Sequence, residues 1–178
     1  KNGGFAMRDK RLTMLVEGAL MVALAFVLSF VRIYSAPYGG TVTLGSMIPI
    51  LLFALRYGTG PGILAGLVYG FTQIIAEPSI VHPIQVILDY PMAFGLLGLA
   101  GVFQDRPVLG ASVGIGGRFV SHLISGVVWW GLYAPEGTNV FVYSVVYNGG
   151  YLLPELVISA IVLKYALQRF VKEKVGVH

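Results

Sequence analysis

The sequence contains no cysteine, and charged residues make up only 11% of its 178 residues. Without cysteine, the chain can form neither disulfides nor thiolate-ligated metal centres, and it offers no thiol nucleophile. Soluble domains usually carry about 25% charged residues. The scarcity of charge, together with 56% hydrophobic residues and a mean hydropathy of +0.80, excludes intrinsic disorder and argues against an ordinary soluble enzyme.

Long apolar stretches make up most of the chain. A membrane-spanning helix needs about 20 mostly apolar residues, so the chain has room for about six and for no separate ATP-binding domain. We predict an all-α integral membrane protein, a single membrane domain over residues 1–178. Residues 1–4 are given no function because they could be a remnant of cloning, and the first apolar stretch is expected to be a span rather than a cleavable signal peptide. The six predicted transmembrane helices cover residues 12–31, 41–55, 60–76, 83–103, 109–132 and 140–170.

The basic residues indicate an orientation. If both termini are cytoplasmic, ten of the 12 Lys and Arg residues fall in cytoplasmic segments, and only Arg32 and Arg118 do not. This distribution follows the positive-inside rule. It accounts for the net charge of +4 without nucleic acid, so we expect a multi-pass protein that contacts the lipid bilayer and binds no nucleic acid.

Motifs for catalysis and nucleotide binding are absent. The glycine-rich segment 58–62 lacks the Gly-Lys-Ser/Thr of a phosphate-binding loop. His82 and His122 have no companion histidine at metal-binding spacing, and the adjacent Ser121 and His122 cannot form a Ser–His dyad of the usual geometry. We therefore expect no enzyme activity, no metal and no cofactor, and any uphill transport must draw energy from a partner or an ion gradient.

Asp89 lies within the fourth apolar stretch, where a charge is costly unless it is paired or faces a cavity. Gln85 lies one helical turn before it on the same face, and Pro91 can kink the helix there. The functional interpretation is a carboxylate that binds a cationic or hydrogen-bonding ligand. The alternative is a structural pair with Arg118 or a capping role.

The fifth stretch places polar and aromatic residues on one helix face. Arg118, His122, Ser125 and Trp129 follow an i, i+4, i+7, i+11 pattern, and Trp130 lies close to the same side. An interhelical hydrogen bond is the structural alternative for the histidine. Anchoring at the membrane interface is the alternative for the tryptophans. Their occurrence together favours a ligand site.

The sixth stretch adds a second polar face. Tyr147, Tyr151 and Glu155 lie at i, i+4 and i+8, with Asn148 beside them. We expect Glu155 to form an ion pair with Arg118, because both lie at membrane depth without another obvious counter-charge. A carboxylate combined with aromatic rings, an imidazole and an amide suits a small cation with a π face. It does not suit a phosphate or a long lipid.

Ala19 and Ala23 lie four residues apart on the first predicted helix. This spacing of small residues lets another helix approach closely. The second helix could belong to a partner or to this protein itself.

Several segments together carry a family resemblance: Glu17-Gly-Ala-Leu-Met-Val-Ala-Leu-Ala-Phe26, Met47-Ile-Pro-Ile50, Leu55-Arg-Tyr-Gly58, His82-Pro-Ile-Gln85, Leu88-Asp-Tyr-Pro91, Ser121-His122 through Trp130, and Tyr143 with Tyr147-Asn148-Gly149. Over nearly its whole length the chain resembles the thiamine-specific substrate-binding subunit (S component) of energy-coupling-factor (ECF) vitamin transporters. The resemblance implies a protein of six helices in the plasma membrane of a prokaryote, with both termini cytoplasmic. It would bind thiamine with high affinity near the outer surface.

The resemblance also implies site residues and partners. To the ligand-binding residues of the family, given below, the helix faces add Gln85, Trp129 and Tyr147. Tyr38 could take the place of an aromatic residue in the family's first outer loop. Ala19 and Ala23 would contact the transmembrane coupling subunit, which joins two cytoplasmic ATPases. The ligand-binding residues that the resemblance itself implies are Asp89, Tyr90, His122, Trp130, Tyr143 and Asn148.

Three other functions remain open from the sequence. The chain could be an S component for another vitamin, such as riboflavin or biotin. It could be a small intramembrane enzyme that uses Asp89 and His122. It could also be a stand-alone carrier coupled to an ion gradient.

Overall fold

The computed structural model describes residues 3–175, with side chains described for residues 9–37 and 39–165. The side chains of residues 1–4, which were given no function, lie outside this part. The elements in chain order are α1 (Gly3–Ser29), β1 (Arg32–Ser35), the 3-10 helix η1 (Pro37–Gly39), β2 (Thr41–Thr43), α2 (Ile48–Tyr57), α3 (Thr59–Ala76), α4 (Pro83–Ile87), the π-helix η2 (Leu88–Met92), α5 (Ala93–Gly95), the 3-10 helix η3 (Leu96–Phe103), α6 (Pro107–Val128), the 3-10 helix η4 (Trp130–Tyr133) and α7 (Val140–Val175).

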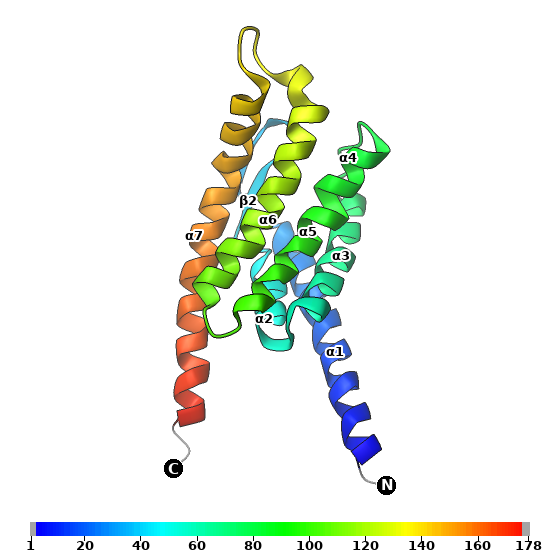
Figure 1. Cartoon of the computed structure of the whole chain (residues 1–178), viewed down its shortest axis with the longest axis vertical. Coiled ribbons are helices and arrows are strands. Elements are labelled where there is room, and N and C mark those ends of the chain that lie inside the picture. Colours follow the sequence, from blue (N-terminus) through cyan, green and yellow to red (C-terminus); the bar gives the residue numbers. More distant parts are fainter. Residues whose placement is uncertain (1–2, 176–178) are drawn as a thin grey trace.

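Five helical segments of the described chain are long and apolar enough to cross a membrane: Asp9–Ser29, Thr59–Ala76, Pro83–Phe103, Pro107–Val128 and Val140–Tyr165. Large apolar side chains project outward from them, including Leu20, Ile75 and Val146, which are 63%, 83% and 67% exposed. Such a surface suits lipid rather than water. The helices run side by side, and both ends of the chain lie at the same end of the bundle (Figure 1).

The second predicted helix, over residues 41–55, is wrong at its start. Residues 41–43 form β2, which pairs antiparallel with β1, and α2 begins only at Ile48. Thr41, Val42 and Thr43 are β-branched and favour a strand. Gly45 has a φ of 91°, a non-helical conformation that separates the strand from the helix. The ten-residue α2 is shorter than the other spans.

Glycines set the packing of the central segment 83–103 against α3. Gly62, Gly66 and Gly70 recur every four residues on α3, and Gly95, Gly98 and Gly101 recur every three residues across the interface. A Cβ at Gly66 would come within 2.8 Å of the carbonyl carbon of Phe94. Residues three apart align in a 3-10 helix, so the tighter winding of η3 keeps its glycines facing α3.

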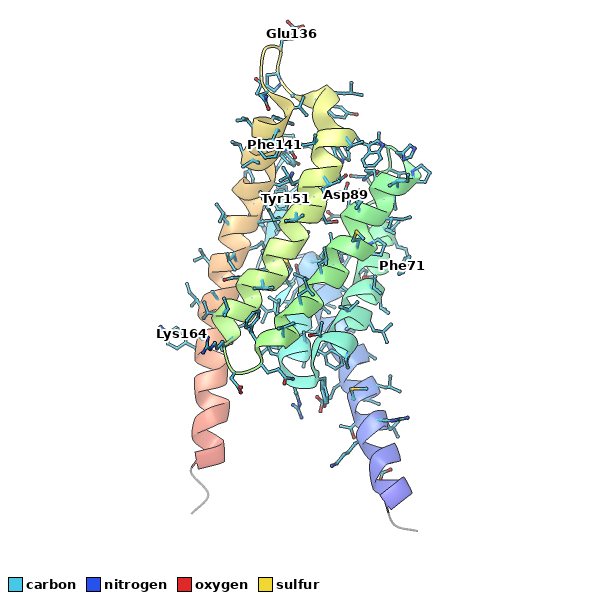
Figure 2. All side chains as sticks on the ribbon, viewed as in Figure 1. Phe71, Asp89, Glu136, Phe141, Tyr151 and Lys164 are labelled. Atoms are coloured by element: carbon cyan, nitrogen blue, oxygen red, sulfur yellow. The ribbon has the colours of Figure 1, made fainter. Side chains whose placement is uncertain are left out.

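The fourth predicted helix is continuous over residues 83–103 but changes its winding. Pro91 lacks a backbone N–H, and residues 88–92 widen into the π-helix η2. Asp89 projects from this widened turn. In Figure 2, Asp89 and Tyr151 lie in the half of the bundle toward Glu136, whereas Lys164 lies toward the end that holds the termini.

Candidate functional site

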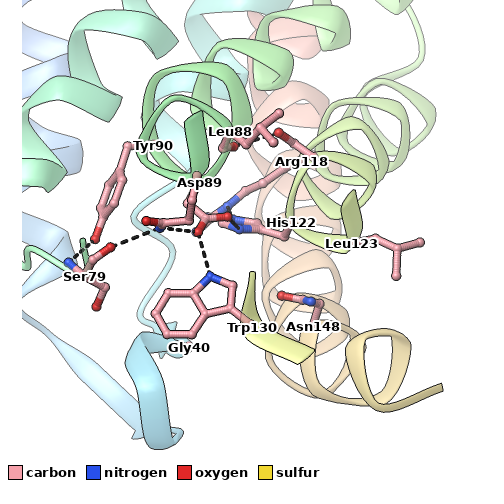
Figure 3. Close-up of polar contacts among 12 residues, drawn as sticks. Gly40, Ser79, Leu88, Asp89, Tyr90, Arg118, His122, Leu123, Trp130 and Asn148 are labelled. Carbon is pink, nitrogen blue, oxygen red and sulfur yellow. Dashed lines mark hydrogen bonds and ion pairs between the residues drawn. The ribbon is translucent and has the colours of Figure 1, made fainter. Parts of the chain in front are cut away.

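Asp89 is the centre of the site, and side chains from three elements donate hydrogen bonds to it. Its Oδ2 accepts from Gln85 Nε2 at 2.6 Å and from Trp130 Nε1 at 3.1 Å. Its Oδ1 lies 3.1 Å from His122 Nδ1 (Figure 3). The Asp89 side chain is only 12% exposed, so these donors replace the water that a buried carboxylate has lost.

Arg118 determines the tautomer of His122. The Nε of Arg118 donates to His122 Nε2 at 3.1 Å. Since a guanidinium only donates hydrogen bonds, Nε2 must offer its lone pair. The proton of the neutral ring is then on Nδ1 and points to Asp89. Arg118, His122 and Asp89 thus form a chain of hydrogen bonds that connects a positive to a negative charge.

The loop before α4 holds Gln85 and Tyr90 in place. The fully buried Gln85 donates from Nε2 to the Ser79 carbonyl at 3.0 Å, and its Oε1 accepts from Val81 N at 3.0 Å. The hydroxyl of Tyr90 accepts from Ser79 N and donates to the Glu77 carbonyl, both at 2.7 Å. This part of the site is therefore fixed before any ligand binds.

A cavity lies beside Asp89, and residues of α7 form one of its walls. The rings of Tyr143 and Tyr147 are stacked, with centroids 6.0 Å apart. The hydroxyl of Tyr151 donates to Asn148 Oδ1 at 2.8 Å, and Asn148 Nδ2 donates to the Ser144 carbonyl at 2.9 Å. The buried Asn148 is therefore held with its amide in a defined orientation.

The loop between α1 and α2 covers the same cavity. Its glycines 39 and 40 and its threonines 41 and 43 line the space. Gly40 N donates to the Tyr147 hydroxyl at 3.0 Å, and that hydroxyl also contacts the Pro37 carbonyl. A Cβ at Gly40 would lie 2.6 Å from the Tyr151 ring, so only glycine lets the loop approach α7 this closely.

The cavity brings most of the predicted residues together. The predicted residues that line it are Asp89, Tyr90, His122, Trp130, Tyr143, Tyr147 and Asn148. Gln85 does not line the cavity, but it donates a hydrogen bond to Asp89, which does. The backbone of Tyr38 lies in η1, and its side chain is outside the described side chains.

Trp129 does not line the cavity, contrary to its predicted place on the face of Arg118 and His122. Its ring stacks on His82 with centroids 5.3 Å apart. The helical extrapolation fails because α6 ends at Val128 and the chain tightens into η4. This change of winding turns Trp130, instead of Trp129, toward Asp89.

The predicted ion pair between Arg118 and Glu155 is also wrong. None of the ion pairs within the described residues joins them. Arg118 instead contacts His122, donates from Nη1 to Met47 Sδ at 2.9 Å, and lies 4.1 Å over the ring of Phe94. Glu155 Oε1 accepts from the N and Oγ1 of Thr43 at 2.5 and 2.6 Å.

Sequence reasoning missed residues that shape the cavity without carrying charge. Gly126 lies where a Cβ would come 3.1 Å from Ser144 Cβ and 3.3 Å from Asn148 Nδ2, so it allows α6 and α7 to approach. Its position four residues after His122 was the available signal. Tyr133 also lines the cavity, and no pattern in the sequence distinguished it from an interfacial aromatic residue.

A known protein family matches most of the chain. The family model described as thiamine transporter protein (Thia_YuaJ) matches residues 15–174.

The chain belongs to the thiamine transporter protein family.

The alignments with its relatives span most of both chains. A thiamine transporter ThiT of Bacillus subtilis (strain 168) is 38% identical over 175 residues, which span 88% of this chain and 91% of that protein. A ThiT of Lacticaseibacillus paracasei is 34% identical over 176 residues, spanning 88% of this chain and 87% of that protein.

A solved structure of ThiT from Listeria monocytogenes superposes with a TM-score of 0.82 at 29% identity, covering 92% of this chain and 97% of that one. This member of the thiamine transporter protein family is thus a multi-pass helical membrane protein. Its relatives are named as transporters, in agreement with the prediction of a non-enzymatic function. In the part of the chain that the structure describes, no group of three or more His, Asp or Glu could hold a metal ion.

Proposed function

We propose that this chain binds thiamine in the cavity between α6, α7 and the segment 83–103, and that it is the S component of an ECF transporter. The observation that carries the ligand assignment is Asp89, a carboxylate fixed by three donors at the wall of a cavity lined by aromatic rings. Cation–π contact with Trp130 and Tyr143 would attract the thiazolium ring.

The remaining hydrogen-bonding capacity suits the aminopyrimidine of thiamine. Both nitrogens of His122 are already used, so this residue offers its ring face. A carboxylate has about four lone-pair sites, and Asp89 uses three of them. Asn148 Oδ1 accepts only from Tyr151 in the described part of the chain, so it can accept once more. The exocyclic amino group of thiamine supplies two N–H donors, which match these acceptors.

Tryptophan fluorescence tests the ligand. Trp130 lines the cavity, so a bound vitamin should quench its emission. We expect saturable quenching by thiamine and none by riboflavin or biotin. Tight quenching by riboflavin or biotin without thiamine would assign the chain to another vitamin and would contradict the proposal.

The charge distribution supports cytoplasmic termini and an outward-facing cavity. The termini share one end of the bundle, at which the end of α2, with Arg56 in its last turn, and the η3–α6 connection, with Arg106, also lie (Figure 1). Positive residues favour the cytoplasmic side, and this supports an orientation with Asp89 toward the outer surface.

The proposed partner is a transmembrane coupling subunit joined to two cytoplasmic ATPases. Ala19 lines an apolar groove between α1, α2 and α3, and Ala23 is exposed one turn further along α1. Small residues at such a surface let a partner helix approach. Uptake of thiamine into proteoliposomes should require the coupling subunit, the ATPases and ATP. Uptake driven by this chain alone would favour an ion-coupled carrier instead.

A further inference from the structure

Glu155 is a buried carboxylate at the cavity that the proposed function leaves without a role. It is 2% exposed and lines the cavity two helical turns beyond Asn148, about 10 Å further along α7. Its Oε1 accepts two hydrogen bonds from Thr43. None of the described residues forms a hydrogen bond with its Oε2. A buried carboxylate oxygen without a donor is costly, so this atom requires a partner that the described part of the chain does not supply.

The other charges around the cavity are balanced in pairs. Four charged residues line it: Glu77, Asp89, Arg118 and Glu155. Glu77 forms an ion pair with Arg32. Asp89 is connected through the neutral His122 to Arg118. No cation of the described residues lies within ion-pair distance of Glu155. The three carboxylates thus face only two guanidiniums, those of Arg32 and Arg118, and one negative charge is left over. Of the three carboxylates, Glu155 is the one with an oxygen that no described residue contacts by a hydrogen bond.

Resting on the proposed function, we infer that Glu155 is the counter-charge that makes the cavity selective for an organic monocation. Arg118 is connected to Asp89 through His122 and also acts electrostatically on Glu155. One guanidinium cannot balance two carboxylates, so the bound cation supplies the second positive charge. Asp89 then fixes the orientation of the ligand through hydrogen bonds, and Glu155 selects for a ligand with a positive charge. A ligand that carries phosphate would add negative charge beside Glu155 and is disfavoured.

Two ligands and one substitution test this role by calorimetry. The neutral thiophene analogue of thiamine, in which carbon replaces the charged ring nitrogen, has nearly the same shape without the charge. In Glu155→Gln, Oε1 and its contact with Thr43 remain. We expect the affinity for thiamine to fall about 10- to 100-fold, as for a charge pair at an intermediate dielectric. The affinity for the neutral analogue should change less than about threefold.

Thr43→Val separates charge from loop position, because it removes the hydroxyl contact to Glu155 but keeps the charge. It should lower both affinities by a similar factor and leave the preference for the cation intact. Glu136→Gln, in the exposed loop before α7, is the matched control and should change neither affinity.

Two outcomes would overturn the inference. One is a wild-type protein that binds the neutral analogue as tightly as thiamine, a result that needs no variant to fold. The other is a Glu155→Gln protein that keeps the wild-type preference for the cation. If the wild-type protein bound no thiamine at all, the proposed function would fail instead, so the two failures are distinguishable.

Discussion

At the scale of single residues, Asp89 is the acceptor in each of its side-chain hydrogen bonds in the described structure. Gln85, Trp130 and His122 each donate to it, so the side chain must accept at both oxygens. An asparagine at this position would turn an amide N–H₂ toward at least one of these donors. The site therefore requires a carboxylate for its own geometry as well as for the ligand.

Replacing Asp89 by asparagine should weaken thiamine binding by about 30- to 1000-fold, or about 2–4 kcal/mol, because a buried donor is left unsatisfied and a charge is lost. Isothermal titration calorimetry on purified protein measures this directly. Asp89→Glu, which keeps the charge but adds a methylene, should lose less affinity. Equal affinity in the wild-type and Asp89→Asn proteins would remove Asp89 from the site.

The two adjacent tryptophans provide a matched pair at the same scale. Trp130 donates to Asp89 and lines the cavity, whereas Trp129 stacks on His82 outside it. Trp130→Phe should lose most of the ligand-induced quenching and bind thiamine more weakly. Trp129→Phe should keep both the quenching and the affinity. Fluorescence titration of the two variants checks this, and quenching that depends on Trp129 would contradict the geometry.

At the scale of elements, the apolar runs predicted the five long spans because length and hydropathy alone decide what can cross a bilayer. They failed at residues 41–47, where an apolar run forms a strand and a turn. They also could not predict that Trp130 faces Asp89, since that depends on where α6 ends. The polar candidates were found because polar groups at membrane depth are costly. The sequence did not predict the hydrogen-bond partner of Glu155, because Thr43 is 112 positions away and carries no charge.

The glycine contact between α3 and η3 leads to a prediction of stability. A Cβ at Gly98 would come within 2.6 Å of Gly62 C, so Gly98→Ala must push the two helices apart. We expect a loss of about 2 kcal/mol or more and a lower melting temperature in detergent.

The control for Gly98→Ala lies on α6. No described atom lies within 4 Å of a Cβ built at Gly116, and alanine is favoured over glycine in a helix by about 0.5–1 kcal/mol. Gly116→Ala should therefore leave the melting temperature unchanged or raise it. Equal melting temperatures for Gly98→Ala and Gly116→Ala would show that the helices can separate at little cost.

At the scale of the whole molecule, the ligand cavity and the α1 groove lie on different parts of the bundle. The cavity is lined chiefly by residues of α6, α7, the segment 83–103 and the first loop, and it also reaches Ser29 of α1 and Tyr69 and Gln73 of α3. The groove is lined by other residues of α1, α2 and α3, and no residue lines both. Binding and coupling should therefore be separable by mutation. An ion-coupled carrier or an enzyme would have no need of the second surface.

Replacing Ala19 by tryptophan should fill the groove beside Phe53 and Leu64 and keep a partner helix at a distance. We expect thiamine affinity, measured by calorimetry, to stay within about twofold of wild type, because the cavity is untouched. ATP-dependent uptake in proteoliposomes with the coupling subunit and ATPases should fall at least about tenfold, with loss of co-purification, since close packing of small residues holds such helices together. Val146→Trp, on the 67% exposed position of α7, introduces the same side chain on another lipid-facing helix and should preserve uptake. Full uptake by Ala19→Trp would place the coupling surface elsewhere on the bundle.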